Sequence, residues 1–151
     1  MPLHNLTYRP IAVGDIEALF TVRIATDENR LTRNELTALG INEQSVADKL
    51  ATTYHGWLCE SGDEVVGFAM GDAATGELWV IAVLPQFIGR GIGSTLIQHV
   101  EAWLWSKGCT ELWLTTDVDT RLRAYAFYRK HGWVDDCIKD GLRYMKKKPV
   151  R

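Results

Sequence analysis

The sequence predicts one α/β domain in which helices pack on a mixed, mostly antiparallel β-sheet of six to seven strands. Its 151 residues suit a single domain, and no repeat, low-complexity segment or Pro/Gly-rich linker divides them. Strand and helix patterns follow one another in the order β-α-α-β-β-β-α-β-α-β-β. The run from Leu78 to Leu84 is apolar at every position, as expected for a strand covered on both faces. We therefore expect residues 1–151 to form one domain with about four helices.

The first elements are a strand and two helices. Residues 6–11 (LTYRPI) have the composition of a strand. A helix begins at Gly14, because the apolar side chains that follow it recur at helical spacing. Residues 26–40 are polar and aperiodic, which predicts a loop. A second helix covers residues 42–51, with Asn42 as its N-cap.

The later elements alternate between strands and helices. Ser61-Gly62-Asp63 is a turn signal between two strand patterns, which predicts a hairpin. After the apolar strand, a helix begins near Ile92, has one apolar stripe and ends at Gly108. The predicted strands cover residues 56–61, 64–72, 77–84, 110–116, 133–138 and 142–148, and the last helix lies within residues 121–132.

Composition and charge exclude several function classes. A formal charge of −2 argues against a nucleic-acid-binding protein, and the basic run Lys146–Lys148 is expected to be a solvated end. The three cysteines and four histidines share no metal-ligand spacing, so we expect no metal site. Cys109 and Cys137 have apolar neighbours and are expected to be buried. Without a signal peptide or an apolar stretch near 18 residues, the chain is expected to be cytoplasmic, with no membrane partner.

Three glycines at alternate positions precede the helix that begins near Ile92. Gly89, Gly91 and Gly93 permit backbone angles that side chains forbid and allow a ligand to approach the main chain. The free N–H groups of the helix then point at that ligand, which favours a phosphate or pyrophosphate. The spacing matches neither the nucleoside-triphosphate loop, which needs a lysine, nor the dinucleotide fingerprint, whose third glycine would fall at Ser94.

The strand ELWVIAVLP, the loop GRGIGS and the later AYAFYRKHGW together resemble the GNAT superfamily of acyl-CoA-dependent N-acyltransferases. Five residues match the family's A-x-x-F-Y-x-x-x-G-[FW] helix motif position for position, namely Ala124, Phe127, Tyr128, Gly132 and Trp133. The resemblance implies the GNAT fold and direct transfer of an acetyl group from acetyl-CoA, as co-substrate, to an amine.

The resemblance also implies a coenzyme A site with two departures from the family pattern. Ile88 stands where the family usually has Gln or Arg, and Arg121 stands where many members have Asn. Arg121 could meet a cofactor phosphate or a substrate carboxylate, and Ser94 a phosphate or the helix N-terminus. The residues implied to contact the cofactor are Ile81, Ala82, Val83, Ile88, Gly89, Arg90, Gly91, Ile92, Gly93, Ser94, Thr95 and Arg121.

Acetyl transfer requires a base and a proton donor. A primary amine with a pKa near 10.4 is only about 0.1% neutral at pH 7.4, so a carboxylate must accept its proton, directly or through water. Glu77, at the head of the apolar strand, matches the position where some family members place this base, and Asp117 is the second candidate. Tyr128 matches the family's general acid. The backbone N–H groups of residues 81–83 would stabilise the oxyanion.

The acceptor amine is not specified by any motif. Both charges and aromatic side chains occur where the family builds its acceptor site, which suits a small polar or zwitterionic amine or a peptide amine. A non-catalytic acyl-CoA sensor is the alternative function, and a nucleotide-binding protein is a third. Many family members pair through their C-terminal strands, which makes a homodimer a possible assembly. The candidate acceptor-site residues are Arg23, Asn29, Arg30, Trp79, Trp113 and Asp117.

Overall fold

A seven-stranded mixed sheet forms the centre of the computed structural model, which describes residues 5–26 and 31–149. The strand order is β1-β2-β3-β4-β5-β7-β6, and only β4 and β5 are parallel neighbours. The strands are β1 (Leu6–Pro10), β2 (Tyr54–Ser61), β3 (Glu64–Asp72), β4 (Glu77–Val83), β5 (Leu112–Asp117), β6 (Val134–Lys139) and β7 (Leu142–Lys147). The helices are α1 (Ile16–Ala25), α2 (Arg33–Ala38), α3 (Glu43–Leu50), α4 (Ile92–Ser106) and α5 (Arg123–Lys130), with 3-10 turns at Val13–Asp15 and Pro85–Phe87.

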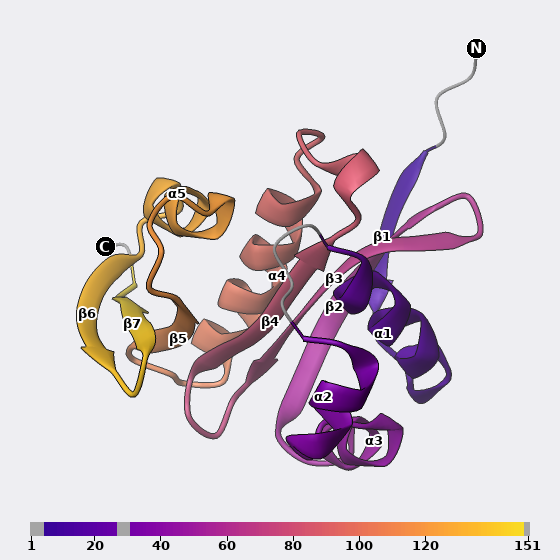
Figure 1. Ribbon diagram of the computed structural model, residues 1–151, viewed down its shortest axis with the longest axis horizontal. Coiled ribbons are helices and arrows are strands. Elements are labelled where there is room, and N and C mark those ends of the chain that lie inside the picture. Colours follow the sequence, from indigo (N-terminus) through magenta and orange to yellow (C-terminus); the bar gives the residue numbers. More distant parts are fainter. Residues whose placement is uncertain (1–4, 27–30, 150–151) are drawn as a thin grey trace.

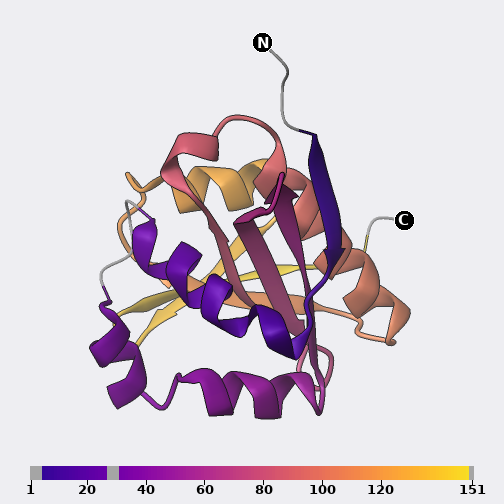
Figure 2. The same ribbon diagram turned by 90° about the vertical axis from the view of Figure 1, so that its right-hand side faces the viewer.

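The helices cover both faces of the sheet (Figures 1 and 2). On β3, Phe68 and Met70 face α1, whereas Gly67 and Gly71 face α4. A Cβ added at Gly71 would lie 2.8 Å from a methyl group of Val100, so glycine here lets α4 approach the sheet closely. Because both faces of β3 and β4 are covered, the apolar run of β4 needs no alternation, which confirms the predicted mixed α/β fold.

The predicted element order is confirmed except between residues 26 and 40, where the predicted loop is wrong. Residues 33–38 form α2, which Thr32 begins by accepting a hydrogen bond from the Glu35 N–H at 3.1 Å. In turn, the Glu35 carboxylate accepts a hydrogen bond from the N–H of Thr32, which completes a capping box. This six-residue helix buries only Leu36, so no apolar period marks it in the sequence. At α3, the predicted N-cap Asn42 is confirmed by a 2.9 Å bond from the Ser45 N–H.

Two expectations about single side chains are also wrong. Lys147 is not a solvated end residue, because its Nζ lies 2.7 Å from Glu101 Oε1 and 2.7 Å from the His131 carbonyl oxygen. Cys137 lies exposed on the edge strand β6 instead of in the core. No helix within residues 5–26 and 31–149 combines the length and apolar composition needed to cross a membrane.

Candidate active site

The sheet opens between β4 and β5. These parallel neighbours share a single register pair, Glu77 with Trp113, and then diverge. On its other side β4 pairs with β3, but the register shifts so that Met70 opposes Val80 while Gly71 opposes Leu78. Trp79 is therefore an extra, unpaired residue, a β-bulge that bends its strand. The bulge lies just beyond the single register pair with β5, where the two strands separate.

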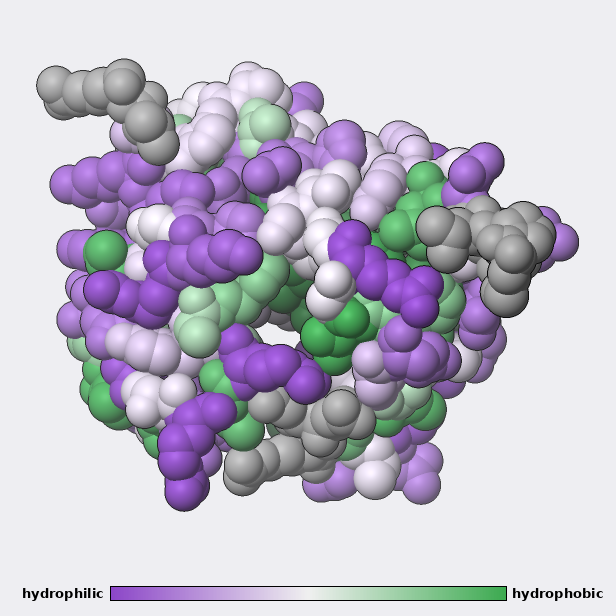
Figure 3. Space-filling model, turned by 90° about the horizontal axis from the view of Figure 1, so that it is seen from above, coloured by the Kyte–Doolittle hydropathy of each residue, from purple (hydrophilic) through white to green (hydrophobic). Residues whose placement is uncertain are grey.

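A cleft of about 670 Å³ occupies the space between the diverging strands. Seen from above, the molecule is hollowed near the middle of this face, with hydrophobic side chains beside the opening (Figure 3). The cleft is lined by residues of α1, β4, the glycine loop, the start of α4, the end of β5 and one side of α5. Its lining residues are Arg23, Thr26, Trp79, Val80, Ile81, Ala82, Val83, Phe87, Ile88, Gly89, Gly91, Gly93, Ser94, Thr115, Thr116, Arg123, Ala124, Phe127, Tyr128 and Lys130.

The glycine loop closes one end of the cleft. Gly89 has φ +87° and Gly91 has φ +80°, a left-handed backbone that favours glycine. Gly91 is the N-cap of α4 and supplies no side chain to the helix N–H groups. The first backbone bond of the helix runs from the Thr95 N–H to the Gly91 carbonyl, so the preceding N–H groups at this positive helix end are free to bind an anion.

Gly93 and Ser94 begin the helix beside the cleft. Gly93 does not have a positive φ, but a Cβ there would lie 3.2 Å from the Phe127 ring, so this glycine lets α5 pack closely. The Ser94 hydroxyl lies 2.9 Å from His131 Nε2, which holds it at the cleft wall. The Thr95 hydroxyl instead donates to the Gly91 carbonyl at 3.1 Å.

The structure brings most of the predicted cofactor residues to the cleft. Thr95 does not line it, and three other predicted residues also lie elsewhere. Ile92 is in the hydrophobic core. The Arg90 guanidinium stacks 4.7 Å from the Phe87 ring centre and does not line the cleft. Arg121 is 89% exposed and pairs with Asp119 at 3.0 Å, outside the cleft lining.

Tyr128 lies on α5 and lines the cleft although it is almost fully buried. Its ring packs edge-on against Phe127 and Trp133. Burial raises the pKa of the Tyr128 phenol well above its usual value, because the phenolate would lose its hydration. The hydroxyl therefore stays protonated at every physiological pH and can donate a hydrogen bond into the cleft.

Glu77 lies at the head of β4, two residues before Trp79. Its carboxylate makes no hydrogen bond or ion pair within the described part of the chain. Burial raises the pKa of Glu77, the nearby charge of Asp72 raises it further, and Lys49 opposes both. A raised pKa makes this carboxylate a stronger proton acceptor than an ordinary glutamate. Glu77 does not itself line the cleft.

The predicted acceptor residues separate into three groups. Arg23 and Trp79 line the cleft. Trp113 lies outside its lining, stacked 6.1 Å from the Tyr144 ring, and Asp117 accepts a bond from the Asp119 N–H. Asn29 and Arg30 lie outside the described residues.

Several lining residues were not predicted from the sequence. Thr115 and Thr116 end β5 where it diverges from β4, and this divergence has no local sequence signal. The α5 residues could have been found, because they recur at helical spacing around Tyr128 and share its face. The unpredicted lining residues are Thr26, Val80, Phe87, Thr115, Thr116, Arg123, Ala124, Phe127 and Lys130.

Comparison with known proteins agrees with this geometry. Residues 21–133 match the model of the acetyltransferase (GNAT) family. The chain is 32% identical over 88 residues to an acetyltransferase of Pectobacterium atrosepticum and 38% identical over 64 residues to one of Photorhabdus laumondii. These matches cover 57% and 41% of this chain but only 62% and 45% of the relatives.

The fold resembles that of PaiA N-acetyltransferase from Thermoplasma acidophilum, crystallised in complex with coenzyme A. The TM-score is 0.83 at 18% identity, and the match covers 96% of this chain and 99% of that one.

Proposed function

Because this chain belongs to the GNAT family of acetyltransferases, we propose that it transfers the acetyl group of acetyl-CoA directly to a primary amine of a small molecule or peptide. The observation that supports this proposal most is the cleft between β4 and β5, which ends at the free N–H groups of α4. An elongated ligand with a phosphate at one end and a reactive group at the other fits such a cleft.

The residues present fit coenzyme A. The left-handed Gly89 and Gly91 and the first turn of α4 would hold its pyrophosphate, with the Ser94 hydroxyl as an additional donor. The backbone of residues 81–83 faces the divergence from β5 and would bind the pantetheine arm as an added strand does. Bound acetyl-CoA supplies a thioester whose acyl group can be transferred.

Glu77 is proposed as the base, with Asp117 as the second candidate. The amine nitrogen forms a bond to the acetyl carbon, its proton passes to Glu77 directly or through water, and the carbon–sulfur bond breaks. The electron pair of that bond leaves on the thiolate. Tyr128 would donate a hydrogen bond to this sulfur as its charge develops. Full proton transfer from a phenol to a thiolate is uphill by about 2 kcal/mol in water, so the thiolate takes its final proton afterwards.

The activity is tested by measuring free thiol released from acetyl-CoA in the presence of amino acids, polyamines, aminoglycosides and short peptides. We expect amine-dependent release above the background without amine, and a rise in melting temperature with CoA. Tyr128→Phe should lower kcat at least tenfold and leave CoA affinity unchanged, because only the hydroxyl is removed. Binding of acetyl-CoA without release for any amine would favour the acyl-CoA sensor. No binding would overturn the cofactor assignment.

We further propose that residues 1–151 act as one cytoplasmic domain that pairs as a homodimer through its C-terminal strands. All three cysteines are free, as is usual in a reducing compartment. Strand β6 is an edge of the sheet, with Val134 45% and Ile138 59% exposed, and such an edge can pair with another strand. Light scattering should give twice the chain mass, and Ile138→Lys should halve it.

A further inference from the structure

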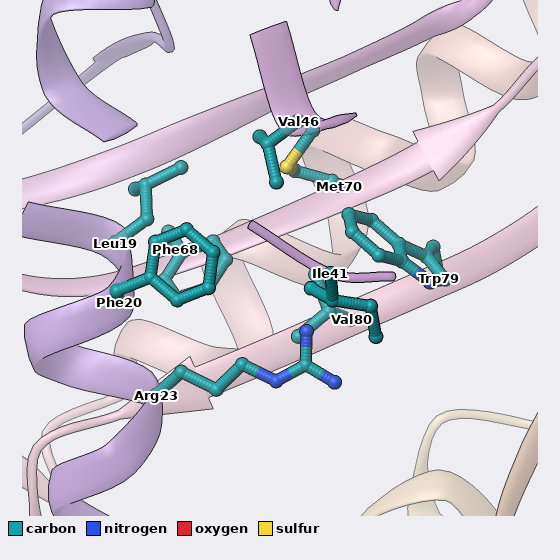
Figure 4. Close-up of a pocket in the computed structure, with 9 residues that line it drawn as sticks. All are labelled: Leu19, Phe20, Arg23, Ile41, Val46, Phe68, Met70, Trp79 and Val80. Carbon is teal, nitrogen blue, oxygen red and sulfur yellow. The ribbon is translucent and has the colours of Figure 1, made fainter. Parts of the chain in front are cut away.

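Arg23 lies where two cavities meet. It is half-buried in the last turn of α1, and its guanidinium carbon lies 5.6 Å from the centre of the Trp79 ring. Arg23, Trp79 and Val80 line both the cleft and a smaller cavity between α1, α3 and the sheet. Figure 4 shows the guanidinium extending from α1 toward Ile41 and Val80. A ligand that reaches the cleft beside Trp79 therefore meets this cation.

Within the described part of the chain, the positive charge of Arg23 has no counter-charge. Among residues 5–26 and 31–149, no carboxylate pairs with its guanidinium and no acceptor receives a hydrogen bond from it. Burial lowers the pKa of Arg23, but an arginine stays protonated at any physiological pH. By contrast, Arg9, Arg33, Arg121 and Arg143 each pair with a carboxylate.

An unpaired, partly desolvated guanidinium is costly, and an anionic ligand offsets that cost. The planar guanidinium matches a carboxylate with two parallel hydrogen bonds. Lys49, another cation near Trp79, lies 5.2 Å from that ring but lines neither cavity. Among the residues that the structure describes, Arg23 is thus the cation that a bound anion can reach at this end of the cleft.

The smaller cavity next to Arg23 is apolar. Apart from Arg23, its walls are aliphatic and aromatic side chains from α1, α3, β3, β4 and the segment before α3. Its volume is only about 20 Å³, so it suits the terminal methyl group of an aliphatic side chain and not an extended peptide. Its lining residues are Leu19, Phe20, Ile41, Val46, Phe68, Met70, Trp79 and Val80, together with Arg23 (Figure 4).

We propose that the acceptor is an α-amino acid with an aliphatic side chain, whose carboxylate pairs with Arg23 and whose side chain places a terminal methyl group in this apolar cavity. The amine would then lie in the cleft, on the side of Trp79 from which Glu77 can accept its proton. This inference rests on the proposed acetyl transfer and adds the chemical class of the acceptor. The acceptor would thus be held by its carboxylate, its side chain and its amine. This selects against amines that lack the carboxylate or the aliphatic side chain.

The test compares four acceptors in thiol release: L-leucine, L-leucinamide, isopentylamine and leucylglycine. Leucinamide and isopentylamine keep the side chain and amine but lack the carboxylate. Leucylglycine carries its carboxylate farther from the amine, so it distinguishes a free amino acid from a peptide terminus. We expect kcat/KM for leucine to exceed that for the other three on the order of 10- to 100-fold, the size of a charged hydrogen bond.

Arg23→Met keeps the aliphatic stem and removes the cation. It should raise the KM for leucine until leucine and leucinamide react equally, while the KM for acetyl-CoA stays unchanged. Arg23→Lys should recover part of the preference, because it keeps the charge and loses the planar fork. Arg129→Met is the matched control, since Arg129 is exposed on α5 and lines neither cavity. It should leave every acceptor unchanged.

Two outcomes would overturn the inference while leaving acetyl transfer in place. One is equal use of leucine and leucinamide by the wild-type protein. The other is an equal loss for all four acceptors in Arg23→Met. If no amine releases thiol, the proposed function fails by itself, and calorimetry with L-leucine and the CoA-loaded protein decides the inference. Binding that Arg23→Met abolishes would support it, and absence of binding would refute it.

Discussion

Gly91→Ala tests whether the glycine loop needs a left-handed backbone at the start of α4. Gly91 has φ +80° and ψ 7°, and an added Cβ would meet no heavy atom within 4 Å. The substitution should therefore lower the free energy of unfolding through backbone strain alone, by about 1–2 kcal/mol for a residue with a side chain in this conformation. At roughly 2–4 °C per kcal/mol for a domain of this size, the melting temperature should fall by about 2–8 °C.

Gly14→Ala is the matched control. A Cβ at Gly14 also meets nothing within 4 Å, but its φ is not positive. Replacing such a glycine by alanine leaves stability unchanged or raises it by up to about 1 kcal/mol, because the unfolded chain loses freedom. Thermal and urea unfolding of both variants measure stability, and calorimetry measures CoA affinity. Only Gly91→Ala should lose affinity. Equal stability of the two variants, or equal loss in both, would refute the reasoning.

Three further predictions concern the proposed base, a buried ion pair and a helix cap. Because the pKa of Glu77 is raised in the fold, its ionisation opposes folding increasingly as pH rises from its ordinary value through the raised one. Glu77→Gln should thus melt higher than wild type at pH 7 and equally below pH 4, while kcat falls about 10²–10⁴-fold and loses its acidic limb. Lys147→Met should destabilise the protein by about 3–5 kcal/mol in urea unfolding, since it leaves the Glu101 carboxylate, only 9% exposed, without its cation. Thr32→Ala should lower the free energy of unfolding, measured in urea, by about 1 kcal/mol through loss of the α2 cap. A decrease of less than a few tenths of a kcal/mol would contradict that role.

Local patterns were sufficient for most of the fold. The hairpin at Gly62, the cap at Asn42 and the stripe of α4 depend on neighbours within a few residues, and all three are confirmed. The short helix α2 was missed because one buried leucine cannot display a period. Lys147 was misjudged because its partner Glu101 is 46 residues away along the chain.

The sequence by itself determined the family, the glycine loop and the place of Tyr128 on the last helix, since motif spacing and helical period are local properties of the chain. Only the tertiary structure decided which charges face the cleft. Arg121 turns to its near neighbour Asp119 outside the cleft, while Arg23 lines the cleft and pairs with no carboxylate of residues 5–26 and 31–149. The single register pair between β4 and β5 opens the cleft itself. Burial and charge pairing depend on which distant segments the sheet brings together, and no local pattern encodes them.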